Sequence, residues 1–133
     1  MSAITHFLFP APAARSTAAI FVWWEHRRLG YNAVMAVTGL CSLAMMSIVA
    51  HLPPGSTELP PIALVVLYAI VANVFYWLGP VVECALELIW PGKLLPTGPT
   101  LFRMGLTFSV GLNFLPSLMM GWDWVIRVLK WLL

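Results

Sequence analysis

Residues 62–82 read IALVVLYAIVANVFYWLGPVV and contain no charged side chain. The hydrocarbon core of a bilayer is about 30 Å thick, and a helix of about 20 mostly apolar residues crosses it. This stretch is therefore long enough and apolar enough to span a membrane. It predicts that the chain is an integral membrane protein.

The composition of the whole chain agrees with this prediction. Of the 133 residues, 61% are hydrophobic and 9% are charged, with 7 Lys or Arg and 5 Asp or Glu. A soluble domain is about 45–50% apolar and about 25% charged, because its surface must face water. The charge deficit excludes a soluble monomer, a disordered tail and a nucleic-acid-binding domain, so we expect no nucleic acid partner.

Two further stretches satisfy the same length requirement. Residues 33–50 carry no charge and end before His51 and a Pro-Pro-Gly turn, and residues 101–120 carry only Arg103, at their start. Proline and glycine between the stretches indicate tight connections. The sequence thus predicts an all-α fold, an integral membrane helical bundle with three transmembrane helices.

Two flanking segments are apolar but combine tryptophan with charge. Residues 13–29 include Arg15 and end in WWEHRR, which is typical of a helix at the level of the lipid head groups. Residues 122–133 are too short to cross alone, so they form an interfacial helix or extend the third span. A fourth span through 114–133 would place Asp123 and Arg127 inside the membrane, which is costly.

These segments define a single membrane domain, 1–133. In chain order we expect an interfacial helix and anchor at 13–32, a first span at 33–51, a second at 62–82 that continues as helix to 90, a third at 101–121, and the interfacial helix or extension at 122–133. Gly79-Pro80 predicts a kink in the second helix, because proline removes a helical donor. Tyr76 and Trp77 place the membrane boundary near residues 77–82.

The basic residues predict the orientation. A cytoplasmic N-terminus places five of the seven on the cytoplasmic side, as the positive-inside tendency favours. These five are Arg15, Arg27, Arg28, Lys93 and Arg103, and the other two are Arg127 and Lys130. Small bacterial membrane proteins of this build are numerous, and we expect a bacterial inner (plasma) membrane location with the N-terminus cytoplasmic.

Polar and small residues recur at helical spacing within the spans. In the second helix they are Asn73, Tyr76, Pro80, Glu83 and Glu87; in the third they are Gly105, Ser109, Asn113 and Ser117; in the first they are Ala33, Ala36, Gly39 and Ser42. Such faces allow helix backbones to approach closely and to form hydrogen bonds. We favour helix packing, either within the chain or between copies. The alternative is a polar path through an oligomer, lined by Asn73, Tyr76, Gly105, Ser109 and Asn113.

Glu83 and Glu87 lie one turn apart on the same helix face. They could bind a divalent cation or share a proton. The predicted topology also brings Arg103, Arg27 and Arg28 to their interface, and a charge cluster that clamps the helices together needs no further assumption.

Five tryptophans are candidate lipid anchors, since indole rings favour the head-group level. They are Trp23, Trp24, Trp122, Trp124 and Trp131. The adjacent Arg27-Arg28 pair can bind lipid phosphate, although an orientation anchor explains the same residues without specific recognition.

No motif for nucleophilic catalysis, phosphate binding or metal binding is present, and His26 has no second His or Cys at ligand spacing. We therefore predict no catalytic residue, no metal and no cofactor. The preferred function is a non-enzymatic subunit or scaffold that works through helix–helix contacts, with membrane lipids and either further copies or another membrane protein as partners. The alternatives are an oligomeric channel or transporter, and an enzyme that modifies lipid through Glu83, Tyr76 and Arg103.

Overall fold

The computed structural model describes residues 3–8, 16–91 and 97–133, and all regular elements in these ranges are helices. Their bounds are α1 (Ala3–Leu8), α2 (Thr17–His51), α3 (Ile62–Tyr76), α4 (Leu78–Ile89) and α5 (Gly98–Leu132). Arg15, Lys93 and the start of the segment predicted at 13–32 lie outside the described residues.

Three helices are long and apolar enough to cross a membrane: α2, α3 continued by α4, and α5. This confirms the predicted all-helical fold and the number of membrane-spanning helices among the described residues. At 1.5 Å per residue, the 35 residues of α2 or of α5 extend for about 52 Å, well beyond the hydrocarbon core.

The two flanking amphipathic helices are not confirmed as separate elements. Helix α2 begins after Ser16, whose hydroxyl accepts a hydrogen bond from the Ala19 amide at 3.4 Å, and it continues without a break to His51. Gly30 does not interrupt it, because one helical glycine costs only about 1 kcal/mol. Residues 122–132 likewise are the last turns of α5, which is the extension that the sequence left open.

The second spanning helix is interrupted close to the predicted kink. Helix α3 ends at Tyr76 and α4 begins at Leu78, so that Trp77 separates them. Pro80 explains the position, since proline has no amide hydrogen and its ring clashes with the carbonyl four residues earlier, which is that of Tyr76.

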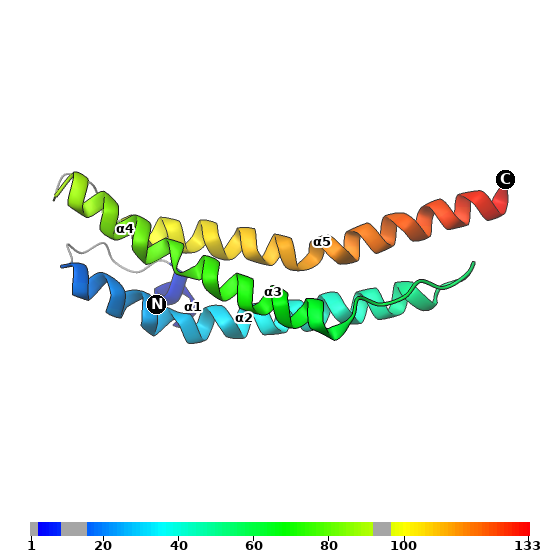
Figure 1. Cartoon of the computed structure of the whole chain (residues 1–133), viewed down its shortest axis with the longest axis horizontal. Coiled ribbons are helices and arrows are strands. Elements are labelled where there is room, and N and C mark those ends of the chain that lie inside the picture. The colour runs from blue at the N-terminus through cyan, green and yellow to red at the C-terminus, as the bar shows by residue number, and fades with distance from the viewer. Residues whose placement is uncertain (1–2, 9–15, 92–96) are drawn as a thin grey trace.

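Helices α2 and α5 run parallel and form the main contact of the bundle, while α3 and α4 run in the opposite direction (Figure 1). The pairs across the contact advance together along both helices: Tyr31 with Ser109, Thr38 with Asn113, and Ser42 with Ser117. This register places the C-terminus at the end of the molecule opposite α1 (Figure 1).

The connection between α2 and α3 is held against the last turns of α5. The Trp124 indole donates to the Pro53 carbonyl at 3.0 Å, and the Arg127 guanidinium donates to the Pro54 carbonyl at 3.3 Å. Arg127 also forms an ion pair with Asp123 at 3.3 Å. Gly55 has a φ of 77°, the left-handed region that glycine adopts without a steric penalty. The last turns of α5 therefore fix the position of the loop between α2 and α3.

The hydrophobic core is concentrated at the end of the bundle that carries α1 and α4. Its buried members are Ile20, Trp24, Tyr31, Tyr76, Cys84 and Phe102. Farther along, the outer surface of all three spanning helices is apolar and exposed. The stretches without charge, 29–50 in α2 and 104–122 in α5, extend for about 33 Å and about 29 Å, which matches the hydrocarbon thickness.

Candidate functional site

Glu83 of α4 joins three helices at the core end of the bundle. Its side chain is 5% exposed, and the Trp24 indole of α2 donates to its carboxylate at 2.7 Å. A methyl group added at Gly98, the first residue of α5, would lie 2.3 and 2.7 Å from the two carboxylate oxygens. The carboxylate therefore lies against the positive end of α5, which favours a negative charge. A buried charge requires such partners.

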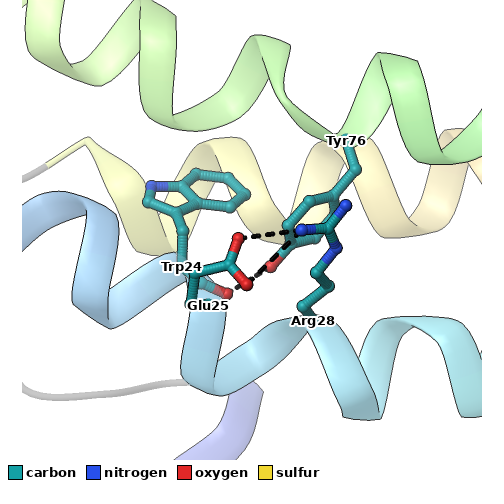
Figure 2. A network of polar contacts seen from close by, with 4 residues as sticks. All are labelled: Trp24, Glu25, Arg28 and Tyr76. Carbon is teal, nitrogen blue, oxygen red and sulfur yellow. Dashed lines mark hydrogen bonds and ion pairs between the residues drawn. The ribbon is translucent and has the colours of Figure 1, made fainter.

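Trp24 is the central packing residue of this site. It is 4% exposed, and its ring occupies the space beside Gly79, where an added methyl group would come within 2.2 Å of ring carbon. Its backbone carbonyl accepts a hydrogen bond from the Tyr76 hydroxyl at 2.5 Å, as Figure 2 shows. Tyr31 packs beside Tyr76 with 4.7 Å between ring centroids and an angle of 44° between the ring planes.

The basic residues of the predicted charge cluster lie around this core in different ways. Arg27 is buried, donates to the Trp23 carbonyl at 3.4 Å and lies over the Trp23 ring. Arg28 pairs with Glu25 of its own helix at 3.1 Å (Figure 2). Arg103 donates to the Pro99 carbonyl at 3.2 Å, within α5.

Glu87 lies one turn beyond Glu83 on α4 and is half-buried. The structure thus brings Glu83 to Trp24 and to the start of α5. A clamp of Glu83 and Glu87 with the arginines stays a prediction.

The polar side chains in the middle of α5 form hydrogen bonds to α2. Ser109 accepts a hydrogen bond from the Tyr31 hydroxyl at 3.0 Å. The Asn113 amide donates to the Thr38 hydroxyl at 2.6 Å and to the Met35 carbonyl at 3.1 Å. The Ser117 and Ser42 hydroxyls are 2.5 Å apart.

Of the residues of the predicted polar path, Tyr76, Gly105 and Ser109 line one pocket and Asn113 lines another. Gly105 is exposed, with no atom within 4 Å of an added methyl group. Asn73 donates to the Ala69 carbonyl of its own helix at 3.1 Å. The two amides therefore each bond to a backbone carbonyl and not to each other.

The predicted lipid anchors differ in exposure. Trp122 and Trp131 are 68% and 71% exposed on α5, where an indole can reach lipid. Trp124 donates to the loop carbonyl described above. Trp23 is half-buried and contacts the Phe102 ring edge-on, and Trp24 lies within the core, where its indole nitrogen serves Glu83.

Several contacts of the candidate site were not predicted from the sequence. Gly79 and Gly98 were interpreted only as helix breaks and turn residues, and neither Tyr31 nor Thr38 was assigned a bond across helices. No local pattern connects Trp24 with Gly79 or with Glu83, because these contacts join residues more than fifty positions apart. Among the described residues, no three His, Cys, Asp or Glu side chains are grouped to hold a metal ion.

Comparisons with protein families, with curated proteins and with solved structures find no match for this chain.

Proposed function

We propose that the chain is a non-enzymatic subunit or scaffold of a membrane complex, acting through helix–helix contacts with further copies or with another membrane protein. We also propose a bacterial plasma membrane location with a cytoplasmic N-terminus, for which the distribution of basic residues is the support. That the three long helices are apolar enough to cross a membrane is the basis of both proposals.

The observation that carries the proposal is Gly111 of α5. An added methyl group there would meet no atom within 4 Å, and the residue is exposed. Ala33 and Ala36 of α2 are exposed in the same way. Small residues are common where helix backbones approach each other closely in a membrane, and a helical glycine costs about 1 kcal/mol relative to alanine. An outward glycine in a span is therefore explained by a neighbouring helix.

The polar groups within the bundle support the same proposal over a conduction path. Asn113, Ser117 and Ser109 form bonds to α2, so their polarity is already used for packing within the chain. Vesicles that contain the reconstituted protein should therefore show no ion flux above that of empty vesicles. A protein-dependent conductance would favour the channel instead.

The direct test compares the wild type with Gly111→Leu. Light scattering in mild detergent and cross-linking in native membranes should give an assembly larger than one chain, and the leucine should reduce it by blocking close approach. Leu115→Ile is the matched control, because it alters an exposed neighbour on α5 at constant volume. A strictly monomeric wild type that also copurifies with no stoichiometric partner would overturn the proposal.

A further inference from the structure

An open groove lies between α2 and α3 at the level of the predicted membrane boundary. Its volume is about 460 Å³, and it is lined by Arg28 of α2, by five residues of α3 between Val66 and Val74, and by Trp77 between α3 and α4. Pockets of this size accommodate small molecules. The groove is separate from the Glu83 site, and its two ends differ in chemistry.

Arg28 lines the polar end of the groove, and its ion-pair partner Glu25 lies one turn earlier on α2. The Arg28 guanidinium lies 5.0 Å from the centroid of the Trp77 ring, and its Nη1 donates to both Glu25 carboxylate oxygens at 3.1 and 3.4 Å. The two side chains are 30% and 47% exposed. Figure 2 shows this pair on one turn of α2 beside Tyr76. Within the described part of the chain, Nε and Nη2 of Arg28 form no hydrogen bond, so both donors are available to an acceptor.

The rest of the groove is apolar. Val66, Ile70 and Val74 line it with branched side chains, and Ala69 leaves space between them. Asn73 contributes an amide to the wall, but this amide donates to the Ala69 carbonyl of the same helix at 3.1 Å. An occupant of this part of the groove would therefore contact a hydrocarbon surface, because the one polar group of the wall, the Asn73 amide, is already hydrogen-bonded within α3.

The length of the groove matches one leaflet of a bilayer. From Trp77 to Val66 the helix advances by about 16 Å, and half of the hydrocarbon core is about 15 Å. An interfacial tryptophan is at the charged end, where aromatic residues meet the head groups. The groove thus has a polar end at the level of the lipid head groups, and the apolar part that follows, called the apolar track, is about as long as one leaflet is thick.

We propose that this groove binds one phospholipid with an amine-bearing head group. The lipid phosphate accepts hydrogen bonds from Arg28, the head-group ammonium donates to Glu25, and one acyl chain lies along α3 from Trp77 toward Val66. A guanidinium and a carboxylate side by side complement a phosphate and an ammonium, whereas an anionic head group would meet Glu25 with like charge.

A second helix fits the groove less well. It would bury the Arg28–Glu25 pair against protein, and removing such a pair from water is costly. Branched residues also keep a second backbone at a distance, while contacts between membrane helices favour small residues.

The test measures lipid retention by native mass spectrometry. The full chain in detergent receives equal amounts of phosphatidylethanolamine, phosphatidylcholine and phosphatidylglycerol with identical acyl chains. The wild type should retain phosphatidylethanolamine in excess of both others, since choline has no N–H donor for Glu25. Arg28→Gln should weaken retention of all three about tenfold, the effect of losing a charge-assisted hydrogen bond. Glu25→Gln should abolish the preference for phosphatidylethanolamine, while the protein should still retain lipid.

A second pair of variants tests the apolar track. Ala69→Phe fills the groove and should reduce retention of all three lipids, whereas Ala63→Phe, an exposed alanine of α3 outside the groove lining, should leave it unchanged. Helix content by circular dichroism confirms that each variant is folded.

Three results would each overturn the proposal: equal retention of the three lipids, a preference for phosphatidylglycerol, or wild-type retention by Arg28→Gln. A disulfide between two copies of Ala69→Cys, in a Cys41→Ala, Cys84→Ala background, would assign the groove to a second copy instead.

Discussion

Gly79 and Gly111 are both helical glycines, but their surroundings differ. The ring of Trp24 fills the space beside Gly79, where an added methyl group would approach ring carbons to 2.2 Å, and nothing lies beside Gly111. A rigid indole cannot move aside in a packed core, so Gly79→Ala should destabilise the fold by about 1–3 kcal/mol. Gly111→Ala should change stability by less than about 1 kcal/mol, in the favourable direction. Unfolding of the purified variants in mixed detergent micelles measures both, and equal stabilities would contradict the packing described for Trp24.

The bond between Trp24 and Glu83 gives a second prediction at this scale. Trp24→Phe keeps an aromatic ring but removes the donor at 2.7 Å from a buried carboxylate, which should cost about 1.5–3 kcal/mol. In combination with Glu83→Gln the two effects should not add, because both variants remove the same charge-assisted bond, and a coupling above about 0.5 kcal/mol is expected. Trp122→Phe, at an exposed tryptophan near the other end of α5, is the control and should show no coupling with Glu83→Gln.

Individual residues show how far the candidate site could be predicted. Glu83 was a candidate because a charged side chain near a span needs a partner. Its partner could not be predicted, since Trp24 has a conventional anchoring role at the head-group level. The structure instead places this ring in the core and directs its nitrogen to the carboxylate. Which tryptophan meets lipid depends on tertiary contacts that spacing does not encode.

At the scale of helices, the number of spans could be predicted from the sequence. The helix faces that pack inside the bundle could be predicted only in part. Hydropathy is a local property, so residues 62–82 identify a span without reference to any neighbour. In lipid, however, an outward face is as apolar as an inward one, so apolar periodicity does not distinguish them. Leu40 and Ile48 of α2 are exposed although they resemble core residues. The polar residues did mark the contact, because Asn113 and Ser117 both bond to α2.

The parallel register of α2 and α5 gives a prediction at this scale. The Ser42 and Ser117 hydroxyls are 2.5 Å apart, so cysteines at both positions bring their sulfur atoms close enough for a disulfide. In a Cys41→Ala, Cys84→Ala background, Ser42→Cys with Ser117→Cys should cross-link within one chain on mild oxidation. The two fragments should then stay joined after cleavage at a protease site inserted between α2 and α3.

Ser42→Cys with Ser109→Cys is the matched control for this register. Residue 109 lies two turns before residue 117, about 12 Å along α5, and it contacts Tyr31 instead. Efficient cross-linking of the control pair, or none with Ser117→Cys, would show that the two helices do not pair in this register.

For the whole molecule, the three helices that can cross a membrane among the described residues predict where the two ends of the chain lie. An odd number of spans places the termini on opposite sides of the membrane, and the separation of the C-terminus from α1 along the bundle agrees with this (Figure 1). In the same cysteine-free background, Leu133→Cys should react with a membrane-impermeant maleimide in intact cells. Ser2→Cys should react only after permeabilisation, because the basic residues near the first span favour the cytoplasmic side. Labelling of both positions under the same condition would mean an even number of crossings, and the reverse pattern would keep three spans and invert the proposed orientation.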